Sequence, residues 1–185
     1  MVNEFLVARG ANLLVRNQLI NWNAKIRDYL REYFDNTPQQ VYGTEFGDAI
    51  AKITYLTERA IAQPDSFRGV LDLQGRLQAA TIVEIETDCL FVDAFTNAPW
   101  NVIKNQPETI KGAATSLIEE LVKESKTLGF SGKIKLYSIV RAKQFYINIG
   151  FVETDELGEV ELTNDAAENF LAKQKRFRET RNNTR

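Results

Sequence analysis

The sequence has no histidine and only one cysteine among its 185 residues. The absence of histidine excludes Ser-His-Asp triads, histidine general bases and the commonest protein ligand of metals. Because Cys89 stands alone, an internal disulfide and a multi-cysteine zinc site are excluded too, and a reducing compartment is indicated. We therefore expect no metal, and proton transfer would have to use Asp, Glu, Tyr, Lys or water.

Neither sign of charge dominates. Lys and Arg number 23 and Asp and Glu 25, which leaves a net charge of −2. This balance argues against nucleic acid or an anionic membrane as the partner of the whole surface. The apolar stretch near the amino terminus contains Glu4, Arg9 and Gly10, so it is typical of neither a signal peptide nor a membrane span. The expected location is cytoplasmic.

The first third of the chain predicts two helices. Apolar and aromatic residues recur at helical spacing from Asn21 to Phe34 and again from Phe46 to Ala62, which Pro64 ends. The segment before Trp22 is compatible with either a helix or a strand. The length suits a single domain, residues 1–185, that buries its own core.

The pattern then changes to strands. From Phe67 to Thr96, three runs rich in β-branched residues are separated by turn signals, which predicts an antiparallel meander. A turn-rich connection over residues 97–109 leads to a strong helix that Gly129 ends. This helix is predicted to place on its solvated face Glu119, Glu120, Lys123, Glu124 and Lys126.

The remaining elements complete a mixed α/β fold. We predict a strand over 133–139, a short helix over 141–148, and short strands around Val152 and Val160. The segment 164–185 begins as a helix and then becomes basic. We interpret its basic part as a frayed, solvated helix end, with a nucleic-acid-binding tail as the alternative. Its basic residues are Lys173, Lys175, Arg176, Arg178, Arg181 and Arg185.

One segment has the features of an anion site. In Thr109-Ile-Lys-Gly-Ala-Ala-Thr-Ser-Leu-Ile118, a loop opens directly into the amphipathic helix. The first N–H groups of a helix lack intrahelical partners and carry the positive end of its dipole. The small side chains of Gly112, Ala113 and Ala114 let a pyrophosphate approach, while Lys111 adds a cation and Thr115 a hydroxyl. Alternatively, these small residues serve only packing or capping.

A second motif makes the first more specific. Ala142 through Tyr146 to Gly150-Phe151 fits the pattern Ala-x-x-x-Tyr-x-x-x-Gly-Phe, and residues 109–114 fit Arg/Gln-x-x-Gly-x-Gly/Ala except at Thr109. From about Val70 to Val160, the chain therefore resembles the GNAT superfamily of N-acetyltransferases. The resemblance implies a mixed sheet with helices on both faces. Ile139 is a further departure, because an Asn often stands there in the family.

The resemblance also implies a cofactor and a reaction. Acetyl-CoA would be the co-substrate, with its pantetheine arm on the main chain of Asp93, Ala94 and Phe95. Its pyrophosphate would lie on the N–H groups of residues 111–115. Ala142 would leave room for the thiol end, and an amine, on a small molecule or a peptide, would attack the thioester directly in a ternary complex. Since dimers are common in the family, a homodimer is compatible with the resemblance.

Two side chains are candidates for proton transfer. The hydroxyl of Tyr146 would protonate the leaving thiolate; the alternative is a core aromatic beside Phe145. Strand alternation places Asp93 between Phe91 and Phe95, where partial desolvation would raise its pKa toward that of a useful base. The alternatives are a structural hydrogen bond at Asp93, and a base supplied by Glu84, Glu86 or water. The departures at Thr109 and Ile139 keep a non-catalytic acyl-CoA sensor as the second interpretation.

Overall fold

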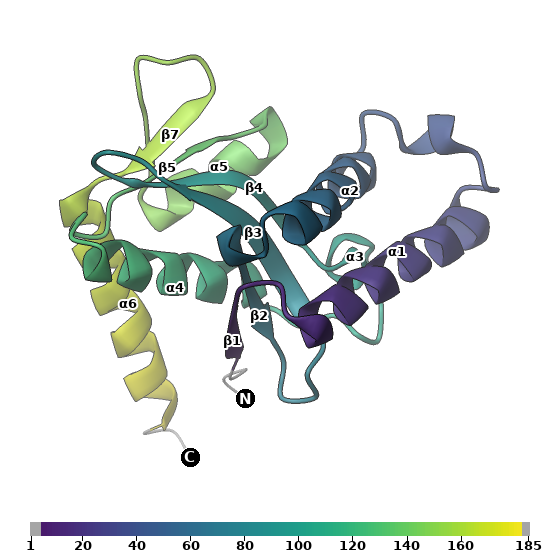
Figure 1. Cartoon of the computed structure of the whole chain (residues 1–185), viewed down its shortest axis with the longest axis horizontal. Helices are drawn as coiled ribbons and strands as arrows, with labels where there is room; N and C mark the ends of the chain where they lie inside the picture. The colour runs from purple at the N-terminus through teal and green to yellow at the C-terminus, as the bar shows by residue number, and fades with distance from the viewer. Residues whose placement is uncertain (1–4, 183–185) are drawn as a thin grey trace. The chain divides into compact units, whose positions relative to one another are not determined.

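The computed structural model describes residues 5–182, which divide into two compact units. The amino-terminal unit comprises residues 5–83 and 94–117, and the carboxy-terminal unit residues 84–93 and 118–182. The predicted single domain stays a prediction. In chain order (Figure 1), the elements are β1 (Leu6–Arg9), α1 (Leu13–Tyr33), the 3-10 helix η1 (Pro38–Val41), α2 (Glu45–Ala62), the 3-10 helix η2 (Pro64–Ser66), β2 (Phe67–Leu71), β3 (Leu77–Ile85), β4 (Leu90–Asn97), α3 (Pro99–Val102), α4 (Ala113–Thr127), β5 (Ile134–Tyr137), α5 (Val140–Ile149), β6 (Val152–Glu153), β7 (Glu159–Leu162) and α6 (Asn164–Asn182).

The strands of the described chain form one mixed sheet. Hydrogen-bonded neighbours follow the order β1-β2-β3-β4-β5-β7-β6, and β4 contributes residues to both units. Strands β1, β2 and β3 are antiparallel, β4 and β5 are parallel, and β7 is antiparallel to both β5 and β6. The predicted mixed α/β class, with the meander first and helices on both faces, is confirmed.

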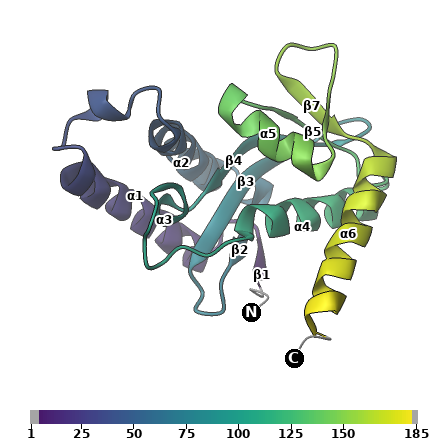
Figure 2. The ribbon, with the colours of Figure 1, turned by 180° about the vertical axis from the view of Figure 1, so that it is seen from behind.

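Two long helices lie side by side in the amino-terminal unit (Figures 1 and 2). The segment before Trp22 is strand β1 followed by the first turns of α1, so the helix begins at Leu13, well before the predicted Asn21. Its start is set by Asn12, whose Oδ1 accepts a hydrogen bond of 3.0 Å from the Val15 N–H. An Asn ahead of an apolar run was the available sequence signal. The unit's buried core includes Leu19, Trp22, Ile26, Ile53, Leu56, Phe67, Leu77, Ile82 and Trp100.

A glycine permits close packing of the last helix in the carboxy-terminal unit. Gly132 has a φ of +89°, and a Cβ built on it would lie 2.8 Å from the Cβ of Ala167 on α6. It would also lie 3.3 Å from Val122 on α4. A side chain at position 132 would therefore force α6 away, since real Cβ contacts are longer.

The basic part of the tail is solvated as predicted, with Arg178 44% exposed, but it is not frayed. Helix α6 is regular to Asn182 and crosses near the end of α4 at a steep angle (Figure 2). Both guanidinium NH groups of Arg178 donate to the Glu119 carboxylate at 2.7 Å, and Lys123 Nζ lies 2.9 Å from Glu119 Oε1. Glu119 is 4% exposed and Glu124 7% exposed, so their predicted solvation is wrong too. The exposed basic residues include Lys173, Lys175 and Arg176; the Arg181 side chain and Arg185 lie outside the described part.

The pairing of Glu119 fixes a local pH dependence. Burial raises the pKa of this carboxyl, but hydrogen bonds from Arg178 and Lys123 outweigh burial and hold its pKa below the usual value. A depressed pKa in the folded state stabilises the fold above the unfolded-state pKa of about 4.3. That stabilisation is lost as the pH falls through the depressed folded-state pKa.

We predict that Arg178→Ala lowers the free energy of unfolding by about 1–2 kcal/mol at neutral pH, a range limited by the partial exposure of Arg178 and by the remaining Lys123. Urea unfolding at neutral and acidic pH would measure this loss. The loss should shrink in acid, where Glu119 is protonated. Arg176→Ala is the matched control, because Arg176 is exposed on the same helix. An equal loss in both variants would contradict the assigned role of the ion pair.

Candidate functional site

The loop before α4 has the geometry expected of an anion site. Gly112 has a φ of +94°, and a Cβ built on it would meet nothing within 4 Å. The backbone therefore favours glycine here, and the space beside it is open. Because the Ser116 N–H donates to the Gly112 carbonyl at 2.9 Å, the N–H groups of Ala113, Ala114 and Thr115 come before this helical bond. These N–H groups form the positive end of the α4 dipole, and Lys111 is exposed next to them.

The start of this loop is tied to α3, a short helix that we did not predict within the turn-rich connection. The Thr109 hydroxyl donates to the Trp100 carbonyl at 2.6 Å, and the Ile110 N–H donates to Asn101 Oδ1 at 2.9 Å. Pro99 at the first turn of α3 was the sequence signal for the helix. Thr109, which departs from the family pattern, thus bonds to the main chain of α3.

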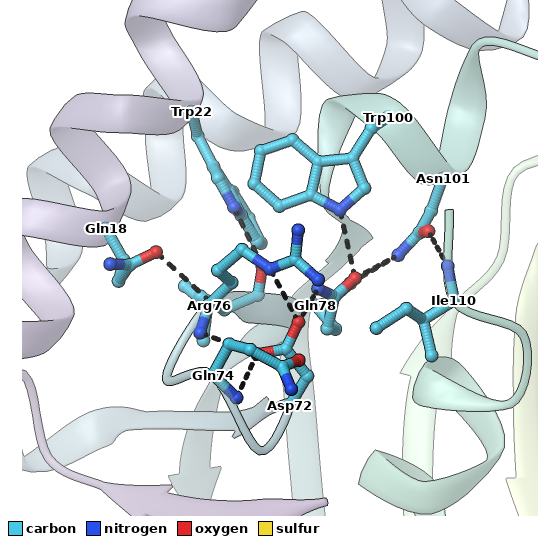
Figure 3. Close-up of polar contacts among 10 residues, drawn as sticks. Gln18, Trp22, Asp72, Gln74, Arg76, Gln78, Trp100, Asn101 and Ile110 are labelled. Atoms are coloured by element: carbon cyan, nitrogen blue, oxygen red, sulfur yellow. Dashed lines mark hydrogen bonds and ion pairs between the residues drawn. The ribbon is translucent and has the colours of Figure 1, made fainter. Parts of the chain in front are cut away.

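The side chain of Asn101 belongs to a buried polar network centred on Gln78 (Figure 3). Gln78 is 0% exposed; its Nε2 donates to Asp72 Oδ2 at 2.9 Å, and its Oε1 accepts from Trp100 Nε1 at 2.9 Å and Asn101 Nδ2 at 3.0 Å. Asp72, itself 3% exposed, also accepts from two main-chain N–H groups and from Arg76 Nε. These bonds join the β2–β3 turn, β3 and α3 in one network.

Strand β4 carries three of the predicted cofactor-binding residues. Its parallel register with β5 joins Leu90–Val92 to Ile134–Leu136, and β4 continues to Asn97. Asp93, Ala94 and Phe95 therefore follow the residues that are in register with β5. Ala94 and Phe95 are buried, and the Ala94 carbonyl accepts from Thr81 Oγ1 at 2.6 Å.

The predicted desolvation of Asp93 is wrong. Its side chain is exposed, as are those of Glu84 and Glu86. Phe91 contacts the Tyr137 ring instead, with the centroids 5.9 Å apart. Alternation itself holds from Leu90 to Ala94, where buried residues alternate with half-buried Phe91 and exposed Asp93, so Asp93 is on the open face of β4.

Tyr146 on α5 is 4% exposed, between the rings of Phe145 at 5.2 Å and Phe151 at 5.4 Å. Burial raises its pKa, so the phenol keeps its proton at neutral pH and is a weaker acid than an exposed tyrosine. Ala142 lies one turn earlier and is half-buried. By contrast, burial and a hydrogen bond to Glu86 raise the pKa of the Cys89 thiol to about 12, which argues against an acyl-cysteine route.

Comparison with known proteins identifies the fold. No protein-family model and no curated protein matches the sequence. The PaiA N-acetyltransferase of Thermoplasma acidophilum, solved with coenzyme A, is 18% identical with a TM-score of 0.50, over 85% of this chain and 96% of that chain. A protein of Exiguobacterium sp. 255-15 described as an acetyltransferase is 15% identical with a TM-score of 0.54, over 90% of this chain and 97% of that chain. The chain has the GNAT fold. The predicted resemblance is confirmed at the level of the fold.

Within this GNAT fold, the predicted site residues divide between the two units. Ala94, Phe95 and residues 111–115 belong to the amino-terminal unit, whereas Asp93, Ala142 and Tyr146 belong to the carboxy-terminal unit. Ile139, the second departure, is the N-cap of α5 and makes no side-chain capping bond. Among residues 5–182, no three Cys, Asp or Glu side chains are grouped as metal ligands, and no helix is long and apolar enough to cross a membrane.

Proposed function

We propose that this chain is an N-acetyltransferase that moves an acetyl group from acetyl-CoA to an amine. The observation that carries the proposal is the loop at the start of α4. There, Gly112 leaves open space beside the first N–H groups of the helix, where the GNAT resemblance places the pyrophosphate of coenzyme A. The GNAT relative from Thermoplasma acidophilum, solved with coenzyme A, supports the choice of ligand.

Several groups of the chain hold the cofactor in this proposal. In the amino-terminal unit, the N–H groups of residues 111–115 and the Lys111 ammonium hold the pyrophosphate, because both offer positive charge to an anion. The main chain of Asp93, Ala94 and Phe95 hydrogen-bonds to the pantetheine arm, much as an added strand would. Ala142 leaves room for the thiol end. Acetyl-CoA supplies the acetyl group as a thioester.

Proton transfer is assigned to the carboxy-terminal unit. The buried Tyr146 hydroxyl keeps its proton at neutral pH and donates it to the leaving thiolate. Asp93 receives the proton of the attacking amine, through water because its carboxylate is exposed. Glu84 and Glu86 are exposed carboxylates of the same unit and are the substitutes. Asp93, Glu84 and Glu86 together favour an acceptor that is cationic before it loses its proton.

We predict that acetyl-CoA raises the thermal stability of the protein. A ligand at one hundred times its Kd adds about 2.7 kcal/mol to the free energy of unfolding, which is readily seen in a thermal shift. Adenosine 3′,5′-bisphosphate and ATP are the ligand controls, and ATP should produce little shift. Lys111→Ala should reduce the shift, whereas Lys104→Ala, which removes an exposed lysine earlier in the same connection, should not. Absence of any shift with acetyl-CoA would remove the proposed function and leave the fold.

The second candidate is a sensor that binds acyl-CoA without turnover. It is favoured by Thr109, which stands where the family has Arg or Gln and whose hydroxyl bonds to the Trp100 carbonyl. A sensor would show the same thermal shift without acetyl transfer to any amine.

A further inference from the structure

We propose that Asn101 is a positioning residue that sets the pyrophosphate-binding loop through a relay running from Asp72 to the Ile110 N–H. The inference rests on the proposed function, because it assigns the loop at residues 111–115 to coenzyme A. All of its members lie in the amino-terminal unit. Figure 3 shows the relay between the β2–β3 turn and the loop.

The relay has a defined polarity that begins at Asp72. An ionised carboxylate can only accept hydrogen bonds, so the group of Gln78 that faces Asp72 must be the amide NH₂. Consequently Gln78 turns its Oε1 toward α3, where it accepts from Asn101 Nδ2 at 3.0 Å. With its NH₂ used in this way, Asn101 presents Oδ1 to the loop and accepts the Ile110 N–H at 2.9 Å.

Burial makes this orientation costly to change. Gln78 is 0% exposed and Asp72 3% exposed, so flipping the Gln78 amide would set its oxygen against the Asp72 carboxylate and its NH₂ against the NH₂ of Asn101, away from water. Asn101 Nδ2 makes a second bond, to the Gln78 carbonyl at 3.1 Å. Thus the asparagine side chain is held at three points, two on β3 and one on the loop.

The Ile110 N–H, which Asn101 holds, directly precedes residues 111–115, the groups proposed to bind the pyrophosphate. Ile110 is followed by Lys111 and Gly112, whose peptide geometry determines where the first N–H groups of α4 point. A Cβ built on Gly112 would meet nothing within 4 Å, so no side chain packs against that side of the segment, and described hydrogen bonds hold it at both ends. One end is α4, and the other is Ile110 on Asn101, supported by the Thr109 hydroxyl on α3.

Asn101→Ala tests the relay, with binding of coenzyme A and of pantetheine, which lacks the pyrophosphate, measured by calorimetry or NMR titration. The loss of one loop-orienting hydrogen bond should raise the Kd of coenzyme A about three- to tenfold. The Kd of pantetheine should stay within about twofold, because the fragment does not reach the loop. Trp22→Phe is the matched control: it removes a buried hydrogen bond to the Leu77 carbonyl, beside Gln78, without a bond to the loop. Its Kd for coenzyme A should equal that of the wild type.

The outcomes are distinguishable. If the wild type binds coenzyme A and Asn101→Ala binds it equally well, the relay is structural only and this inference is overturned. The inference would also be overturned if Asn101→Ala bound coenzyme A and pantetheine with equally reduced affinity. The same holds if Trp22→Phe lost as much affinity for coenzyme A as Asn101→Ala. If the wild type binds no coenzyme A, the proposed function fails and takes this inference with it. Should Asn101→Ala not fold, Asn101→Ser, whose hydroxyl is too short to span Gln78 and Ile110, is expected to give the same selective loss.

Discussion

Replacing Tyr146 by Phe is expected to lower the rate of acetyl transfer by about 10²- to 10⁴-fold, the usual contribution of a positioned general acid. The substitution removes only the hydroxyl and keeps the ring that packs on Phe145 and Phe151. The Kd of acetyl-CoA should therefore stay the same. Because burial raises the pKa of Tyr146, the wild-type phenol is protonated through the neutral range and loses its proton only in strong alkali. Loss of the Tyr146 proton should consequently lower the wild-type rate only at alkaline pH.

Single-turnover kinetics and titration with acetyl-CoA would separate the two effects. Tyr137→Phe is the matched control, since the Tyr137 hydroxyl bonds to Glu156 at the surface of the same unit. A full rate in Tyr146→Phe would show that Tyr146 is only a core aromatic. The sensor would be favoured if the wild type bound acetyl-CoA without turnover and Tyr146→Phe bound it equally well.

Replacing Trp22 by Ala is expected to lower the free energy of unfolding by about 3–5 kcal/mol, the usual cost of removing a buried tryptophan. Trp22 is 0% exposed and lies edge-on to Trp100, with ring centroids 6.4 Å apart. Its Nε1 donates to the Leu77 carbonyl at 3.0 Å. The substitution therefore opens a cavity and leaves a buried carbonyl without this donor.

Urea unfolding would measure the loss, with two controls. Trp22→Phe keeps most of the volume and removes the hydrogen bond, so it should cost only about 1–2 kcal/mol. Tyr42→Ala removes an aromatic side chain that is 92% exposed and should cost almost nothing. Equal losses in Trp22→Ala and Trp22→Phe would contradict the assigned packing role.

Features that depend on local spacing were predictable. The stripe from Phe46 to Ala62 became α2, and the runs after Phe67 became β2, β3 and β4 with antiparallel order at the start of the sheet. These predictions were confirmed because helical and strand periodicity express which side of one element is buried. The loop around Gly112 was recognisable for the same reason, since its small residues immediately precede an amphipathic helix.

Features that depend on a distant partner were not predictable. Glu119 has the spacing of a solvated residue, yet Arg178, fifty-nine positions later, buries it by pairing with it. Alternation groups Asp93 with Phe91 and Phe95, but it does not say whether another element covers that face, and the Asp93 side chain is exposed. Each outcome depended on which other element covered the position. The periodicity of a single segment carries no information about that.

The amino-acid sequence by itself determined the mixed α/β class, the GNAT resemblance and the position of the loop proposed to bind pyrophosphate, because each is encoded in local spacing and in residue size. The tertiary structure alone decided how that loop is held. Asp72, Gln78 and Asn101 come from the β2–β3 turn, β3 and α3, and no sequence pattern relates them. Their hydrogen bonds arise only when folding removes these polar groups from water and leaves one another as the available partners.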